Sequence, residues 1–230
     1  MKIIFLNTWD GTVKKEIERF ITNHSKDTEI FCLQEIYEKM KVLCKDLFQE
    51  YMVASDYKHI NDNESYFQNT YVRRDLSVIS KKTLLKNTQG TGLAVYTQIQ
   101  SGNKTLHVCN VHGVSQPGDK TDNKNRLQQS LEIINFFKEI KGLKIIGGDF
   151  NLEFDTQSVK MFEESGYKNL IKDFNIPTTR NRLTWEKYPE EGKQYFADYV
   201  FVSPDVPIKE FSVPNIEISD HLPMILDIEL

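Results

Sequence analysis

The sequence has few cysteines, and their arrangement excludes two kinds of small cross-linked domain. The 230 residues include 3 cysteines, Cys32, Cys44 and Cys109. Because they are odd in number and far apart, they form neither a zinc-binding pattern nor a disulfide framework. Cys32 and Cys109 lie in apolar, strand-like runs, where we expect buried, reduced thiols.

A long apolar run is also missing. No stretch approaches the ~20 apolar residues that a helix needs to span a bilayer. The run Met1–Leu6 is too short for the core of a signal peptide, and Trp9-Asp10-Gly11 follows it in place of a small-residue cleavage site. We therefore expect a cytoplasmic protein that does not insert into a membrane, and we expect it to be a monomer.

An excess of basic charge is absent as well. The formal net charge at pH 7 is -4, whereas proteins that bind nucleic acid tightly and unassisted show a basic signature. Bound metal ions or local basic patches can supply the attraction instead. With 39% hydrophobic residues, and without a linker, low-complexity segment or internal repeat, the sequence predicts a sizeable core and one domain over residues 1–230.

The segment Leu143–Asn151 is the stretch around which the predicted site is arranged. Its apolar, β-branched beginning predicts a buried strand, and Gly147 and Gly148 interrupt it. Asp149 and Asn151 follow, and residues i and i+2 of an extended chain point to the same side. Ligands of α/β sheets gather at this end of the strands. An ordinary Asx turn is the alternative interpretation, since both residue types suit turns.

The predicted elements follow the order of an α/β protein. Strands at 2–7 and 29–33 alternate with helices at 12–24 and about 37–48. Short runs near 66–72, 76–80, 92–98 and 105–110 predict antiparallel strands, with an exposed loop at Asn61–Glu64. After a polar loop at 115–125, a helix is predicted to about Ile140, with Leu127, Leu131, Ile134 and Phe137 or Phe136 on its apolar face. A helix at 156–166, a polar connection at 175–194, and strands at 196–203 and 221–228 complete the chain.

Six apolar strands end in, or contain, polar residues of related types. Asp198 lies inside an otherwise apolar strand, where a carboxylate is costly unless it is paired or bound to a cation. The full set is Asn7, Gln34 with Glu35, Asn110 with His112, Asp149 with Asn151, Asp198, and Asp220 with His221. Carboxylate and carboxamide oxygens without thiolates suit Mg²⁺ or Mn²⁺, and imidazoles supply proton donors or phosphate-facing cations. The combination favours hydrolysis of a phosphate ester.

These short motifs, taken in order, resemble those of the endonuclease/exonuclease/phosphatase superfamily, which includes deoxyribonuclease I, apurinic endonucleases, bacterial sphingomyelinases and inositol-polyphosphate phosphatases. The matching pieces span nearly the whole chain: Leu6-Asn7-Thr8-Trp9, Leu33-Gln34-Glu35, Asn110-Val111-His112, Gly148-Asp149-Phe150-Asn151, Asp198-Tyr199-Val200-Phe201 and Ser219-Asp220-His221. The resemblance implies a four-layer α/β sandwich, in which two mixed β-sheets pack face to face between helices, with the site at one edge.

The resemblance also implies a role for each matching residue. Glu35 would be the principal ligand of Mg²⁺ or Mn²⁺, with Asn7 beside it, and Asp220 would lie near this metal or a second one. Asp149 would orient or deprotonate the attacking water, and Asn151 would hold a phosphate oxygen. His221, oriented by Asp198, would face the phosphate, and His112 would contact the phosphate or assist the leaving group. The chain departs from some relatives at Trp9, where they carry an aspartate that binds metal.

Structural interpretations of the same residues remain open. Asn7 could cap the turn before the first helix, and Glu35 could be a charge favoured by a helix dipole. His112 could be an ordinary loop histidine, and Asp220-His221 a polar turn.

Loops around the strand ends would select the substrate. Arg126, Arg180 and Arg182 suit phosphate contact, and Trp185 could stack on a base or ring. Each arginine could equally be a solvated surface residue, and Arg126 could brace its helix against the sheet. The leading hypothesis is a phosphodiesterase or phosphatase with nucleic acid as substrate. The alternatives are hydrolysis of a small-molecule or lipid-headgroup phosphate, and a catalytically silent binding protein with the same fold.

Overall fold

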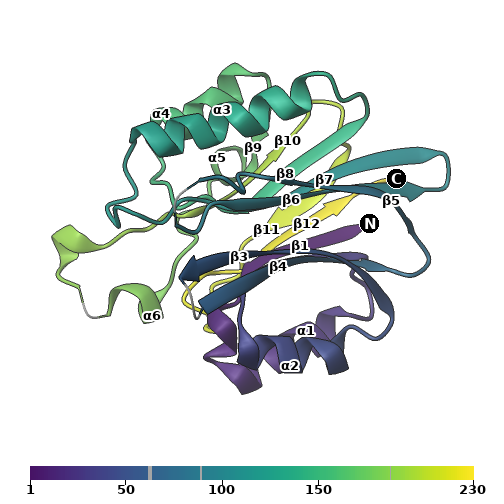
Figure 1. The fold of residues 1–230 in the computed structure, drawn as a ribbon, viewed down its shortest axis with the longest axis horizontal. Helices are drawn as coiled ribbons and strands as arrows, with labels where there is room; N and C mark the ends of the chain where they lie inside the picture. The colour runs from purple at the N-terminus through teal and green to yellow at the C-terminus, as the bar shows by residue number, and fades with distance from the viewer. Residues whose placement is uncertain (62–63, 89, 187) are drawn as a thin grey trace.

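The chain forms two mixed β-sheets packed face to face, with helices on both outer sides (Figure 1). The structure is a computed structural model that describes residues 1–61, 64–88, 90–186 and 188–230. Within these residues each sheet has six strands. The predicted four-layer α/β sandwich is therefore confirmed. None of the described helices has the length and apolar character needed to cross a bilayer.

The first sheet has the strand order β11-β12-β1-β2-β4-β3. Its strands are β1 (Lys2–Asn7), β2 (Ile30–Ile36), β3 (Tyr51–Asn61), β4 (Glu64–Arg73), β11 (Ile208–Ser212) and β12 (Met224–Ile228). The neighbours β1 and β2 run parallel, with Asn7 opposite Gln34, and the other pairs are antiparallel. The polar ends of two successive strands therefore lie at the same edge.

The second sheet has the order β5-β6-β7-β8-β10-β9. Its strands are β5 (Ser77–Leu84), β6 (Leu93–Ser101), β7 (Lys104–His112), β8 (Leu143–Asp149), β9 (Lys168–Asn169) and β10 (Asp198–Val202). Strands β7 and β8 are parallel, and β10 is antiparallel to β8. Their register places His112, Asp149 and Asp198 side by side on three neighbouring strands.

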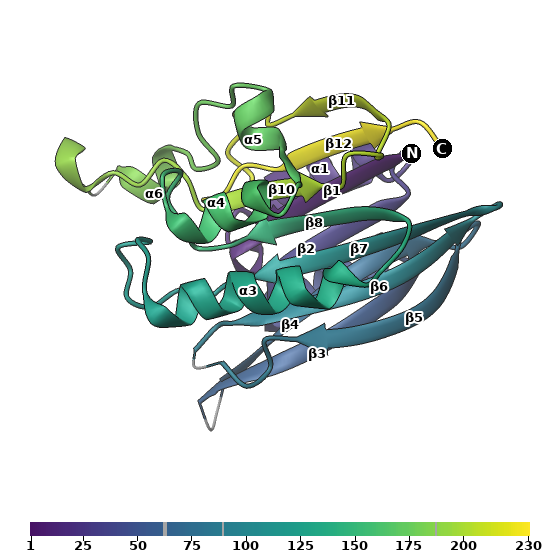
Figure 2. The same ribbon diagram turned by 90° about the horizontal axis from the view of Figure 1, so that it is seen from above.

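The helices cover the outer faces of the two sheets. In Figure 1, α1 (Lys14–His24) and α2 (Glu38–Leu47) lie on the first sheet, and α3 (Lys124–Lys138), α4 (Gln157–Glu164) and α5 (Leu170–Asp173) lie on the second. The short elements η1 (Trp9–Gly11), α6 (Arg182–Trp185) and η2 (Glu190–Gly192) belong to connections. Both views place α6 at the end of the sandwich opposite the two termini (Figures 1 and 2). The strand ends that carry the polar residues point to that end.

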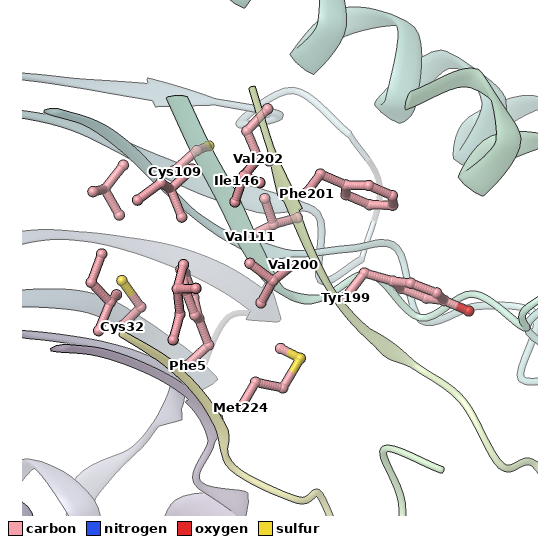
Figure 3. Packing of buried hydrophobic residues seen from close by; sticks show 14 of the residues in the cluster. Phe5, Cys32, Cys109, Val111, Ile146, Tyr199, Val200, Phe201, Val202 and Met224 are labelled. Carbon is pink, nitrogen blue, oxygen red and sulfur yellow. The ribbon is translucent and has the colours of Figure 1, made fainter. Parts of the chain in front are cut away.

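The main core lies between the sheets and extends beneath the helices of the second. Val200 points toward Phe5 and Met224 of the first sheet, whereas Tyr199 and Phe201 point away from it (Figure 3). The sheets approach so closely at Gly147 that a Cβ there would lie 2.8 Å from the Phe5 ring. A side chain at this position would have to displace the ring. Cys32 and Cys109 are buried and form no disulfide with another described cysteine.

Several elements differ from the prediction. The inner face of α3 consists of Arg126, Gln129, Ser130, Ile133 and Phe137. Leu131 was predicted to face the core but is 41% exposed, because the polar residues of α3 turn inward to bond loop carbonyls and amides. Strands β3, β9 and β11 were not predicted. Residues 62–63 of the predicted exposed loop lie outside the described part of the chain, and Glu64 begins β4.

Candidate active site

Asp149, at the end of β8, is the centre of the polar cluster. Its side chain is 2% exposed, and its Oδ2 accepts a hydrogen bond of 3.0 Å from Asn7 Nδ2 across the two sheets. The same oxygen lies 3.7 Å from His112 Nε2 and 3.6 Å from His221 Nε2. The backbone N–H of Asn151 donates to Oδ1 at 2.9 Å. One buried carboxylate thus lies between two imidazoles.

The charge of Asp149 is stabilised by its surroundings. Burial by itself raises the pKa of this carboxyl, but His221, His112 and Lys120 outweigh burial and hold the pKa below its usual range. Asp149 is therefore ionised at neutral pH. An ionised carboxylate can accept hydrogen bonds from a water molecule or bind a cation.

His221 is oriented by Asp198. Its Nδ1 lies 2.9 Å from both carboxylate oxygens of Asp198, so Nδ1 carries a proton and Nε2 faces Asp149. Burial raises the pKa of Asp198. Burial and Arg180 lower the pKa of His221. The carboxylates of Asp198, Asp149 and Asp220 raise it by more, so the pKa lies above its usual value. The pair therefore favours a protonated imidazole that faces the Asp149 carboxylate.

Glu35 enters the cluster through an irregularity of β2. The pairing of β2 with β4 shifts register between Leu33 and Ile36, and Glu35 has φ +54°. A positive φ is uncommon for residues other than glycine. The shift brings Glu35 Oε1 within 3.6 Å of His112 Nε2. Among the described residues, His112 Nδ1 has no hydrogen-bond partner. An N–H on Nε2 points toward the two carboxylates of Glu35 and Asp149.

Glu35, His112 and Asp149 form a group that fits a divalent cation. One donor atom from each lies within 4.8 Å of the others, and two of the three are carboxylate oxygens, which suit Mg²⁺ or Mn²⁺. Asp149, Asp198 and His221 form a second such group. In this second group His221 is already hydrogen-bonded to Asp198, so the Glu35 group fits an ion better.

Asn7 is oriented by two neighbours. Its Oδ1 accepts from the backbone N–H of Trp9 at 3.1 Å, and its Nδ2 donates to Asp149. A flipped amide would lose both bonds, because the Trp9 N–H only donates and ionised Asp149 only accepts. Asn7 therefore holds Asp149 in place, with one lone pair of Oδ1 left for an ion. Its predicted metal contact stays a prediction.

Asp220 lies at the border of the cluster. Its Oδ2 accepts from Arg180 Nη2 at 3.1 Å, and its Oδ1 lies 3.9 Å from His221 Nε2. Asp10, which the sequence analysis did not assign to the site, accepts from the backbone N–H groups of Tyr37 and Met40 at the start of α2. Asp10 therefore caps a helix.

Lys120, which the sequence placed only in a loop that could select the substrate, lies beside Asn151 of the cluster. It is buried, and its Nζ donates to Asn151 Oδ1 at 2.6 Å, while Asn151 Nδ2 lies 3.3 Å from the carbonyl of Gly113. An ammonium cannot accept and a carbonyl cannot donate, so the amide orientation of Asn151 is fixed. The only sequence signal was a lysine after Pro117-Gly118 in the loop that follows β7.

Of the predicted substrate-contacting residues, two lie beside the cluster and one is exposed; Arg126 is described below. Arg180 is buried beside Asp220 and His221, and Trp185 lies near it in α6. Arg182 is exposed and pairs with Glu186 and Glu217.

Arg126 has no free side for a substrate, which corrects its predicted role. It is 0% exposed, and its guanidinium donates to the carbonyls of Val114, Ser115, Pro117 and Thr121 and to the carboxylate of Asp119. The cause is the loop after β7, which wraps around this side chain. Arg126 braces the loop that carries Lys120, whereas the alternative interpretation of the sequence had it brace its helix against the sheet.

A cavity of about 370 Å³ adjoins the cluster between this loop and the connection that contains α6. A second hollow, of about 680 Å³, lies on the Glu35 side. Trp9 lines both. The cluster thus lies where bound molecules can reach it from two directions.

Comparison with known proteins gives the family. The model of the "Endonuclease/Exonuclease/phosphatase family" matches residues 7–221. A search of curated proteins found no match. Among solved structures, an endonuclease/exonuclease/phosphatase from Bacteroides vulgatus is similar, with 18% identity, a TM-score of 0.78, and coverage of 100% of this chain and 98% of that one.

Two further structures share the fold. A mannosyl-6-phosphatase of Bacteroides thetaiotaomicron VPI-5482 has 14% identity, a TM-score of 0.76 and 100% coverage of both chains. TDP2 from C. elegans has 17% identity and a TM-score of 0.75, covering 99% of this chain and 74% of that one. At these identities the likeness shows the fold alone, but the family model spans nearly the whole chain and covers the residues from Asn7 to His221 on which the resemblance rests. The chain belongs to the endonuclease/exonuclease/phosphatase family.

Proposed function

We propose that this protein hydrolyses a phosphate ester with a water molecule, assisted by Mg²⁺ or Mn²⁺. The single observation that carries the proposal is the position of Asp149, an ionised carboxylate held by Asn7 within 3.7 Å of two imidazole nitrogens. Buried carboxylates of this kind are costly without a functional or structural return. The family name covers phosphatases as well as nucleases.

Glu35 and Asp149 would hold the divalent ion, with His112 beside it. A bound ion would neutralise the charge of the phosphoryl group and lower the pKa of bound water. Asp220 is bonded to Arg180, so its role in metal binding is the weaker one. It would set the charge around His221 instead.

Asp149 would orient the attacking water. Since its pKa is held below the usual range, its main contribution is to accept a hydrogen bond from the water and fix its direction. It takes up a proton only as the attack proceeds. The geometry that matters is the alignment of water and phosphorus, which is worth several orders of magnitude in rate.

The remaining residues would stabilise the charge that develops on the phosphoryl oxygens. Protonated His221, oriented by Asp198, presents Nε2 as a donor. Asn151 has a second amide hydrogen for a phosphate oxygen, and Lys120 places a positive charge behind Asn151. His112 would donate from Nε2 to the leaving group. Fixed donors of this kind are worth about 10²- to 10³-fold each in turnover.

The substrate has two candidate classes. Nucleic acid is the first, and the phosphate ester of a small molecule or lipid headgroup is the alternative. Neighbours of the same fold are titled as a mannosyl-6-phosphatase and as TDP2. A panel of plain DNA, abasic DNA, RNA, inositol phosphates, sugar phosphates and sphingomyelin would separate the classes.

Hydrolysis of bis-(p-nitrophenyl) phosphate tests the reaction itself. We expect turnover with Mg²⁺ or Mn²⁺, none with EDTA, and a loss of at least about 10²-fold in Asp149→Ala and in His221→Ala. Asp205→Ala and His59→Ala are matched controls, because both residues are exposed and outside the cluster. A binding protein without catalysis would show no metal-dependent turnover in any variant.

A further inference from the structure

The cavity of about 370 Å³ beside the cluster has a charged inner end and an aromatic outer part. Lys120, Arg180 and Asp220 belong both to the cavity lining and to the surroundings of His221 and Asn151. Arg180 donates from Nη2 to Asp220 and from Nε to Thr184, and within the described residues its Nη1 makes no hydrogen bond. The inner end therefore offers cationic groups next to the position of the phosphate.

The outer part is lined by Trp9, Trp185 and Tyr188. The ring centroids of Trp185 and Tyr195 lie 5.2 Å apart, and this contact helps to hold the Trp185 ring in place. Aromatic faces of this kind bind planar bases and the apolar faces of sugar rings by stacking. The combination suits a ring that is attached to a phosphate.

Trp9 is held in a strained turn. Trp9 and Asp10 both have φ +47°, a conformation that is unfavourable in residues other than glycine. The helix-capping bonds of Asp10 and the bond from Trp9 N to Asn7 Oδ1 hold the turn in place. Such strain clusters at functional sites, and here it places Trp9 between the cavity and the second hollow.

The two loops that form the cavity are joined to each other. Gln194 Nε2 donates to the carbonyl of Gly118 at 2.6 Å, and both residues line the cavity. The backbone of Arg180 pairs with that of His221, which ties the other end of the α6 connection to the cluster. These contacts join the two loops and close the pocket on that side. An open groove that accommodates a polymer would require the two loops to be separated.

The second hollow, on the other side of Trp9, is acidic. Asp10, Glu35, Glu38 and Glu64 line it, and among the described residues of the lining Lys39 is the one basic residue. A nucleic-acid strand that continued past the cluster in this direction would place its phosphates against these carboxylates. Such contacts oppose binding, since affinity for nucleic acid comes largely from basic contacts to phosphate.

We propose that this cavity binds the ring-bearing alcohol of a compact phosphate monoester, a nucleoside or sugar phosphate, and that polymeric nucleic acid is not the substrate. The proposal rests on the proposed function. In the reaction, the oxygen of water bonds to phosphorus, the bond from phosphorus to the ester oxygen breaks, and the alcohol leaves with a proton. The products are the free alcohol and inorganic phosphate. Stacking on Trp185 holds the ring while Lys120 and Arg180 face the phosphate.

The test measures kcat/KM of the full chain, in the presence of Mg²⁺, for four compounds. They are a nucleoside 5′-monophosphate, a hexose 6-phosphate, glycerol 3-phosphate and a single-stranded oligonucleotide. We expect kcat/KM for at least one ring-bearing monoester to exceed the values for glycerol 3-phosphate and the oligonucleotide by about tenfold or more. The nucleoside and hexose arms distinguish the two sources of the ring. Equal values for glycerol 3-phosphate, or a preference for the oligonucleotide, would overturn the proposal.

The variant Trp185→Ala tests the cavity directly. The ratio of kcat/KM for the preferred ring ester to that for glycerol 3-phosphate should fall about fivefold or more, since stacking on one aromatic ring is worth about 1–3 kcal/mol. Phe174→Ala removes an exposed aromatic side chain that packs on Phe211 and does not line the cavity, and should leave the ratio unchanged. An unchanged ratio in Trp185→Ala would exclude the proposed ring contact.

Binding separates this proposal from the proposed function. If no ester is hydrolysed, including bis-(p-nitrophenyl) phosphate, the proposed function fails. Calorimetric titration of the native chain with the same monoesters and with inorganic phosphate then shows whether the cavity binds the ring. Tighter binding of a ring ester than of phosphate, lost in Trp185→Ala, supports the cavity, and equal binding of all ligands overturns it.

Discussion

Lys120 Nζ donates a hydrogen bond of 2.6 Å to Asn151 Oδ1 and thereby fixes the amide orientation of a residue that follows a different strand. Lys120 precedes α3 in the loop after β7, whereas Asn151 follows β8. The bond joins the cavity wall to the residue proposed to hold a phosphate oxygen. The backbone N–H of Glu153 also donates to the carbonyl of Lys120 at 2.9 Å. Both the backbone and the side chain of Lys120 are therefore held by the segment that follows β8.

The variant Lys120→Met should lower kcat/KM by about 10²-fold, because it removes both a positive charge and the donor that orients Asn151. If Lys120 acts through Asn151, the double variant with Asn151→Ala should lose little more than Asn151→Ala alone. Lys120→Arg should restore part of the rate, and Lys124→Met, at the exposed start of α3, should have no effect. Additive losses would assign Lys120 an independent role.

The variant Asp198→Asn should fold normally and turn over roughly 10²- to 10⁴-fold more slowly, because the amide no longer fixes the direction and the proton of His221. Steady-state kinetics and circular dichroism measure the two properties separately. Native kinetics in this variant would remove the assigned role of Asp198.

The same variant should change the pH dependence of kcat/KM. The carboxylate of Asp198 is one of the groups that raise the pKa of His221. Since protonated His221 is the active form in this account, activity should decline as pH rises through that pKa. Without the negative charge the imidazole loses its proton at lower pH, so the alkaline limb of the profile should move to lower pH. A limb that stays in place would show that another group controls it.

The variant Arg126→Met should destabilise the protein by about 3–5 kcal/mol, because it leaves buried carbonyls of the loop after β7 without donors. Arg126→Lys should rescue little, since an ammonium cannot reproduce the planar guanidinium fork. Urea unfolding measures both. Arg182→Met is the matched control, because Arg182 is exposed and makes surface ion pairs, and its free energy of unfolding should not change measurably. Equal effects of the two substitutions would contradict the bracing role.

The residues at strand ends could be predicted because two local signals coincide there. Apolar runs identify the strands, and polar residues such as Asp149 and His221 interrupt or follow them. Their order along the chain was enough to indicate the family and the fold, and both are confirmed. The structure brings Asn7, Glu35, His112, Asp149 and His221 into one cluster.

Other features depend on contacts between distant segments that no local pattern encodes. Helical periodicity assigned Leu131 to the core, but the inner face of α3 is set by the carbonyls and amides that Arg126 and Gln129 bond. Lys120 lies in a polar loop, where a lysine is ordinarily solvated, and only the folded chain shows that it is buried. The register shift that turns Glu35 inward likewise appears only when β2 pairs with β4.

The most direct test of the central claim is the location of Mn²⁺ in crystals of the protein, read from anomalous scattering. The account predicts a strong peak in contact with the carboxylates of Glu35 and Asp149, which disappears in Glu35→Gln. A peak elsewhere, or none at a Mn²⁺ concentration that supports turnover, would contradict it.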